Sequence, residues 1–419
     1  MIQHLLKLLW KQRRQNAWIA AELFLVFILL WYIMDYFITI GYADSIDSAY
    51  NIEDTYQVRL TTVPANSPNY IHYENTEEHA VDRYLSIIER IRQYPQVEEV
   101  CLTLDSSPYN PSYLDNQMGK DSTEMVQFQF LQVTPSYFDV FKVQTQNAEA
   151  SSSLRSALSE KEIVISRKLA EALFPGEQAK GQSVYMGNES SFRIGGVCGA
   201  LKRDDYSHEE RAAYFLLSAS NFKEWNEKQL AWSLGISIRV KPGLNKQTFI
   251  KHFEQDMREQ INTGNFILSR VDSYYDLRER LYLTNGVTDA IRYRIAFMIF
   301  LVFNIFLGII GTFWFRNEYR KPEIGLRLAV GSTRNQILRM MIGEGWLLLS
   351  LVAIPAVILC INLAKMEFIG TNIMQINFFR IFFGLSITYL FMAFVIMLGA
   401  WYPAWLSSRI APADTLRSE

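Results

Sequence analysis

The sequence predicts a membrane protein with four transmembrane α-helices and a large α+β extracytoplasmic domain inserted between helices one and two. Four apolar runs are long enough to cross a hydrocarbon core of about 30 Å. Between the first two runs lie about 250 residues of ordinary soluble composition, which is the length of a whole domain. The overall composition, 49% hydrophobic and 20% charged, therefore averages two different populations of residues.

The predicted organisation has nine parts. Helices at 17–40, 291–316, 346–363 and 378–401 cross the membrane, and they are separated or flanked by a cytoplasmic amphipathic helix at 1–16, the periplasmic domain at 41–290, a cytoplasmic region at 317–345, a short periplasmic loop at 364–377 and a cytoplasmic tail at 402–419. A cleaved signal peptide is the alternative for 17–40. That alternative is disfavoured because the apolar core is too long, contains Glu22 and lacks a small-residue cleavage site.

The first sixteen residues have helical periodicity, with apolar side chains on one side and basic side chains opposite. The two sets are Ile2, Leu5, Leu6 and Leu9, and Lys7, Lys11 and Arg14. This pattern predicts an interfacial helix on the inner leaflet. A positively charged tail that only fixes the topology is the alternative.

Basic residues close to the span ends predict the orientation of the chain. Segments 1–16 and 317–345 are rich in Lys and Arg, whereas the loop at 364–377 contains only Lys365 and Glu367 as charged residues. We therefore expect both termini on the cytoplasmic side of a bacterial inner membrane and the large domain outside. Within the spans, Asp35 is expected to be interfacial, Asn304 to bond a neighbouring helix and Pro355 to kink its helix.

The domain at 41–290 shows a mixed α+β pattern. A helix is expected from about residue 77, with Val81, Leu85, Ile88 and Ile91 facing inward, and it should end near Tyr94 and Pro95 and be followed by a strand at 97–104. Ser166 is a plausible N-cap of a second helix. Cys101 and Cys198 share this domain and could pair in an oxidising compartment.

No pattern of catalytic or ligand-binding residues stands out. The segment HYENTEEH, at 72–79, has neither zincin nor calcium-loop spacing, and no phosphate-binding G-x-x-x-x-G-K-[ST] motif occurs. The formal net charge of −2 and the lack of a basic stripe give no indication of nucleic-acid binding. We therefore expect no catalytic, metal or cofactor site, and any ATP-driven role needs a partner ATPase.

The region at 317–345 holds the most informative stretch, EIGLRLAVGSTRNQILRMMIGEG, which predicts two short helical stretches broken at Gly331 and Ser332, the second running directly into the apolar segment of the third span. Glycine suits the left-handed conformation that ends a helix, and Thr333 with Gln336 has capping-box spacing. The apolar side of the second helix, at Ile337, Leu338 and Met341, must be covered by lipid, another span or a docked protein. We favour docking over a loop that merely reverses the chain.

These residues resemble a known family. The run RNEYRKPEIGLRLAVGSTRNQILRMMIGEG is similar to the cytoplasmic coupling region of FtsX-like permeases, in particular MacB-type ABC transporter permeases. Segments VTPSYFDVF, EIVISRKLAEALFPGEQAKGQSV and FRIGGVCG resemble the periplasmic core domain of that family, and YPAWLSSRIAPADTLRSE resembles its ending. Pro322 departs from the pattern and should kink or start a helix there.

The resemblance implies a permease subunit that dimerises with a second copy or a homologous permease, binds a cytoplasmic ABC ATPase and transmits its motion to the periplasmic domain. A periplasmic adaptor and membrane lipid are further possible partners. The implied coupling surface comprises Glu323, Gly325, Arg327, Gly331, Arg334, Ile337, Leu338 and Met341. MacB-like export is the favoured function, and lipoprotein release or FtsX-like regulation of a cell-wall hydrolase are the alternatives.

Overall fold

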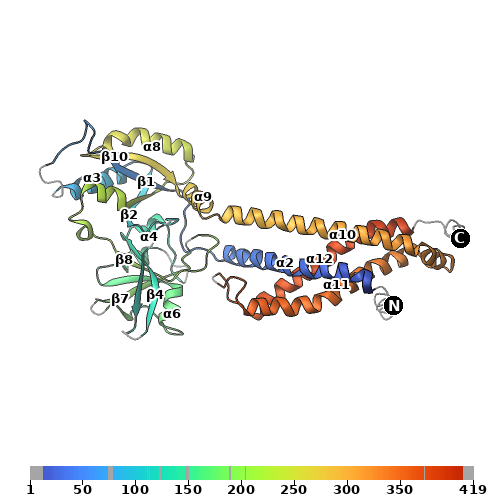
Figure 1. Ribbon diagram of the computed structural model, residues 1–419. Helices are drawn as coiled ribbons and strands as arrows, with labels where there is room; N and C mark the ends of the chain where they lie inside the picture. Colours follow the sequence, from blue (N-terminus) through green and yellow to red (C-terminus); the bar gives the residue numbers. More distant parts are fainter. Residues whose placement is uncertain are drawn as a thin grey trace. The chain divides into compact units, whose positions relative to one another are not determined.

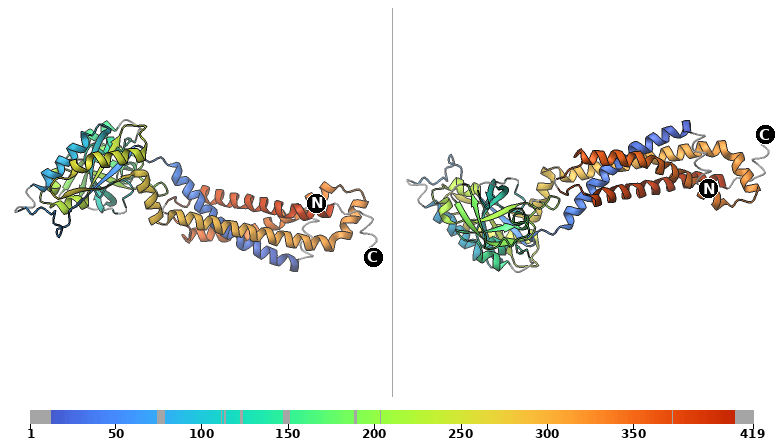
Figure 2. Two further views of the ribbon diagram at one scale, coloured as in Figure 1. Left: turned by 90° about the horizontal axis from the view of Figure 1, so that it is seen from above. Right: turned by 90° about the horizontal axis from the view of Figure 1, so that it is seen from below.

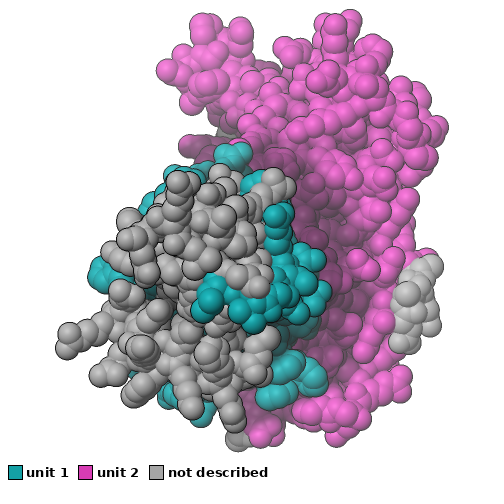
Figure 3. Space-filling model, turned by 90° about the vertical axis from the view of Figure 1, so that its right-hand side faces the viewer, with its two compact units in different colours: residues 1–43, 288–419 teal, residues 44–287 magenta. Residues whose placement is uncertain are grey.

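The computed structural model describes residues 13–73, 79–110, 112, 114–121, 124–146, 151–187, 190–202, 204–371 and 373–408. The chain divides into two compact units: a helical unit, formed by residues 1–43 with 288–419, and an α+β unit, formed by residues 44–287 (Figure 3). The predicted amphipathic helix at 1–16 lies almost wholly outside the described residues.

Four long helices make up the helical unit (Figures 1 and 2). They are α2 (Arg13–Ser45), α10 (Val287–Ala329), α11 (Arg334–Lys365) and α12 (Phe378–Ser408). Each contains a stretch long and apolar enough to cross a membrane, at Ala17–Ser45, Val287–Gly311, Arg334–Lys365 and Phe378–Trp401. The prediction of four membrane helices around one inserted domain is therefore confirmed.

The four helices share one apolar core, in which Phe27, Leu30 and Trp31 of α2 are almost completely buried with Leu349 of α11 and Met392 of α12. The opposite faces carry exposed phenylalanines, leucines and isoleucines, as expected of helices surrounded by lipid.

Two sequence-based expectations for this unit need correction. The helical stretch before Gly331 is not a separate short helix, because it is the end of α10, whereas the stretch after Gly331 runs on into the third span within α11, as expected. Of the two outcomes expected at Pro322, a kink or a helix start, the helix start is excluded, because α10 runs through position 322 as one element.

One half of the α+β unit is a four-stranded antiparallel sheet with helices packed on it. Its strands are β1 (Thr55–Thr62), β2 (Val97–Leu104), β9 (Leu234–Val240) and β10 (Phe266–Ser273), in the order β10-β1-β9-β2. Helix α3 (Ala80–Arg92) connects β1 to β2, and α8 (Lys246–Ile261) connects β9 to β10. This βαββαβ order is the ferredoxin-like arrangement, with a long insertion between β2 and β9.

The insertion forms a ring of six strands. They are β3 (Leu114–Gly119), β4 (Met125–Val133), β5 (Glu162–Ser166), β6 (Ser183–Met186), β7 (Ser190–Cys198) and β8 (Ala212–Leu216), and the parallel pairing of β4 with β8 closes the order β4-β3-β6-β7-β5-β8. Strands β3 and β6 meet at the single pair Gly119 and Tyr185. The short helices α5 (Ser152–Ser156) and α6 (Arg167–Leu173) pack on this ring, whereas α4 (Tyr137–Val140), α7 (Glu227–Ser233) and α9 (Tyr274–Thr284) contact strands of the other half, and η1 (Ala219–Phe222) lies between β8 and α7.

Several local predictions for this unit are confirmed. Helix α3 buries Ile88 and Ile91 as expected, whereas Val81 and Leu85 are only partly buried, and β2 spans 97–104 as expected. The Ser166 hydroxyl accepts a hydrogen bond from the Leu169 backbone N–H, at 3.4 Å, and so caps α6. Cys101 and Cys198 are both buried as free thiols, so they do not form the disulfide that was considered.

Candidate coupling site

The turn at 330–333 between α10 and α11, together with the helix ends beside it, is called the tip, and its turn is built as the sequence predicts. Helix α10 ends with a hydrogen bond from the Val330 N–H to the Leu326 carbonyl, at 3.0 Å. Gly331 follows with φ of 99°, a conformation that only glycine adopts without a steric cost. Thr333 then caps α11 through a reciprocal capping box with Gln336, which satisfies two of the backbone N–H groups that a helix start leaves free. The tip is therefore a defined turn.

The apolar side chains that are exposed at the tip are not those of Ile337, Leu338 and Met341, which the sequence suggested. Ile337 is only 2% exposed and Met341 is 3% exposed, and both belong to the core shared with α2 and α12, while Leu338 packs partly against it. The side chains of Leu326 and Val330 are 58% and 81% exposed. Another span, not a docked protein, thus covers the Ile337 side of α11.

The remaining predicted coupling residues divide by position. Glu323, Gly325 and Arg327 lie in the last turns of α10, and the structure describes only their backbone. Gly331 and Arg334 are exposed at the tip. The assignment of this set to ATPase coupling stays a prediction.

Helix α11 is tied to α12 along the span. The Trp346 indole N–H donates to the Ala393 carbonyl at 2.9 Å, and the hydroxyls of Ser350 and Tyr389 are 2.8 Å apart. Since hydrogen bonds between apolar helices fix their register, α11 and α12 form a pair that begins at the tip.

An ion pair that the sequence reasoning missed joins α12 to α2. Asp35, expected to be interfacial, is 3% exposed, and its two carboxylate oxygens accept from Arg380 Nε and Nη2 at 2.9 and 2.7 Å. Arg380 occupies the third position of the predicted span four. An ionisable residue in each of two apolar spans, with opposite charge, was the signal that could have identified the pair.

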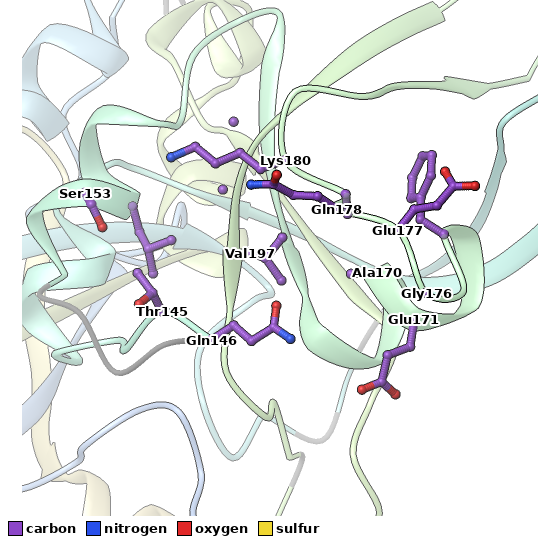
Figure 4. A pocket seen from close by; sticks show the side chains of 15 residues that line it. Thr145, Gln146, Ser153, Ala170, Glu171, Gly176, Glu177, Gln178, Lys180 and Val197 are labelled. Atoms are coloured by element: carbon purple, nitrogen blue, oxygen red, sulfur yellow. The ribbon is translucent and has the colours of Figure 1, made fainter.

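The α+β unit contains a hollow of about 600 Å³ between β7, α5 and α6. Figure 4 shows Thr145 and Ser153 on one side of Val197 and the carboxylates of Glu171 and Glu177 on the other. The polar side chains that line it are mostly exposed. Among the described residues, no cluster of His, Cys, Asp and Glu could hold a metal ion.

The fold and the tip define a polytopic membrane protein with a large inserted domain, and comparison with known families gives its class. The model of the MacB-like periplasmic core domain matches residues 37–256, and the model of the FtsX-like permease C-terminal region matches residues 295–412. The chain belongs to the FtsX-like, MacB-type family of ABC transporter permeases. It is accordingly a multi-pass protein of the cytoplasmic (inner) membrane.

Solved structures are similar to about half of this chain. A domain of a permease protein from Porphyromonas gingivalis is 14% identical, with a TM-score of 0.35 over 54% of this chain and 94% of that chain. The periplasmic region of MacB from Actinobacillus actinomycetemcomitans is 12% identical, with a TM-score of 0.31 over 53% and 90%. The extracellular domain of the noncanonic ABC-type transporter YknZ from Gram-positive bacteria is 14% identical, with a TM-score of 0.31 over 51% and 100%. No curated protein matches the chain.

Proposed function

We propose that this chain couples ATP hydrolysis by a separate cytoplasmic ABC ATPase to movement of its α+β unit, in MacB-like export or efflux by mechanotransmission. The family implies an ABC ATPase partner in general. In the proposal the ATPase grips the α10–α11 tip, both chain termini are cytoplasmic, the α+β unit is periplasmic, and two permease copies form a dimer. A periplasmic adaptor would receive the movement in an export pathway.

The continuity of α11 is the observation that carries this proposal. The helix begins at the tip with a capped first turn and runs for 32 residues to Lys365, which is a length of about 48 Å. A hydrocarbon core takes up about 30 Å of that length. Although Pro355 lies inside it, α11 remains one continuous helix, so it can carry a displacement from the tip to the far side of the bilayer.

The exposure of the tip indicates where the ATPase would bind. Val330 and Leu326 are apolar and exposed beside a turn that glycine and a capping box hold in shape. Apolar side chains on a preorganised turn are well suited to enter a groove of a partner, because little conformational freedom is lost on binding.

The test is the substitution Val330→Asp in the full chain, expressed with its ATPase. A carboxylate in an apolar contact should weaken binding by about 2 kcal/mol, or roughly thirtyfold in Kd. Membrane abundance should stay normal, because an exposed residue contributes little to stability. The measurement is the affinity of the detergent-solubilised chain for the purified ATPase.

Two controls separate a tip contact from a general effect of charge. Val330→Leu should bind the ATPase as the wild type does, because the side chain stays apolar. Leu114→Asp makes the same kind of change on the α+β unit, where Leu114 of β3 is 55% exposed, and should also leave binding unchanged. Full ATPase affinity in Val330→Asp would overturn the assignment of the tip as the docking site.

A further inference from the structure

The Asp35–Arg380 ion pair is almost completely buried within the helical unit. The side chains are 5% and 1% exposed. The Arg380 guanidinium also donates to two backbone carbonyls of the loop between α11 and α12: to Gly370 at 2.9 Å and to Met374. One side chain of α12 thus binds α2 and the loop that follows α11.

Helices α2 and α12 approach each other closely next to the Asp35–Arg380 pair. Gly384 lies one turn after Arg380, and a methyl group added to it would come within 3.5 Å of the Trp31 indole nitrogen. Trp31 lies one turn before Asp35 and is 1% exposed. The contact between α2 and α12 therefore has an aromatic ring against glycine at one level and a bidentate ion pair at the next.

An ion pair is an expensive way to join two apolar helices. Removing both charges from water costs free energy that well-packed apolar residues would not cost, so stability alone does not account for the pair. A bidentate guanidinium–carboxylate contact does, however, fix distance and orientation together. Such geometry suits a joint that must transmit displacement without slipping.

The Asp35–Arg380 pair lies between the two helices that are linked to the tip and the helix that leads to the α+β unit. Helix α11 starts at the tip and is hydrogen-bonded to α12, and α12 is joined by Arg380 to α2. Helix α2 continues to Ser45, while the α+β unit starts at Asp44. The last two residues of α2, Asp44 and Ser45, thus already belong to that unit.

We propose that the Asp35–Arg380 pair is the joint through which movement of the α11–α12 pair reaches α2, and through α2 the α+β unit. Both are positioning residues. This inference rests on the proposed function, since it names the internal contact that the proposed coupling uses.

The test uses the full chain in complex with its ATPase in lipid nanodiscs. Spin labels at Met366→Cys and Trp232→Cys, which are 74% and 88% exposed in the helical and α+β units, report the distance between the units with and without ATP. The three native cysteines are buried. The test variant is Asp35→Leu with Arg380→Met, which removes both charges and leaves neither unpaired.

We expect the double variant to accumulate, bind the ATPase and hydrolyse ATP as the wild type does, but to lose the ATP-dependent change in label distance. Thr388→Val is the matched control. Its hydroxyl is buried in α12 and donates only to the Gly384 carbonyl of its own helix, at 2.8 Å, so the change in distance should be kept. A merely structural pair would lower abundance and ATP turnover together.

Each other outcome is decisive. A double variant that keeps the change in distance overturns the joint and leaves the proposed function standing. If the double variant does not accumulate, Asp35→Asn replaces it, and the joint is overturned if that variant keeps the change or also fails to accumulate. A wild-type complex with no ATP-dependent change would overturn the proposed function itself, and the joint with it.

Discussion

The substitution Ile337→Asp distinguishes a core position from a docking position. Ile337 lies one turn into α11 and is 2% exposed in the core of the helical unit. Burying an isoleucine side chain contributes about 1.5–3 kcal/mol, and that contribution is lost in the variant. A carboxyl group without a designed partner adds about 1–3 kcal/mol of desolvation cost. The expected loss of stability is therefore about 2.5–6 kcal/mol.

Membrane abundance and the thermal unfolding midpoint in detergent should both fall for Ile337→Asp. Ile337→Val removes one methyl group and should cost only about 0.5–1.5 kcal/mol, so it serves as the graded control. Val330→Asp, at the exposed tip before α11 begins, should keep the wild-type unfolding midpoint. If Ile337→Asp were as abundant and as heat-stable as the wild type yet failed to bind the ATPase, the side chain would have to face the partner, and the argument from the buried core would be refuted.

Three further predictions concern the tip, the thiols and the topology. Gly331→Val places a β-branched residue at φ of 99°, so it should destabilise the turn by about 1–2 kcal/mol and weaken ATPase binding, whereas an unchanged affinity would mean that the turn conformation is unimportant. Burial raises the pKa of the Cys198 thiol to about 12, so this thiol should not react with a thiol reagent at pH 8 in the folded chain. Because the thiol ionises near pH 8.5 in the unfolded chain, its burial should stabilise the fold below pH 8.5, and this stabilisation should be lost as the pH rises toward 12. A thermal unfolding midpoint that rises over this pH range would contradict the prediction. Cysteines at Trp232 and Asn335 should label from opposite sides of oriented vesicles with an impermeant reagent, and labelling from one side would contradict the proposed topology.

The sequence predicted best where a local rule determines the structure. Gly331 and the Thr333–Gln336 capping box are short-range features, and the structure has both of them as expected. The same holds for the Ser166 cap and for the four spans, which follow from length and apolarity.

Contacts between distant segments could not be predicted in the same way. The periodicity of α11 shows that Ile337 and Met341 share an apolar side, but it does not show whether a span or a partner covers that side. Asp35 and Arg380 are 345 positions apart, and only the packing of α2 on α12 brings them together. The strand order β10-β1-β9-β2 could not be predicted for a related reason. Its two central strands, β1 and β9, pair with each other although a long insertion separates them in the sequence.

The most direct measurement of the central claim is the distance between the helical unit and the α+β unit in the wild-type chain bound to its ATPase. Spin labels at Met366→Cys and Trp232→Cys would be recorded without nucleotide, with ADP, and with ATP held by an ATPase that cannot hydrolyse it. If the chain transmits the state of the ATPase across the membrane, the distance distribution in the ATP-bound complex differs from the other two, and Val330→Asp removes that difference. An identical distribution in all three states, in a complex shown to contain the ATPase, would contradict the claim.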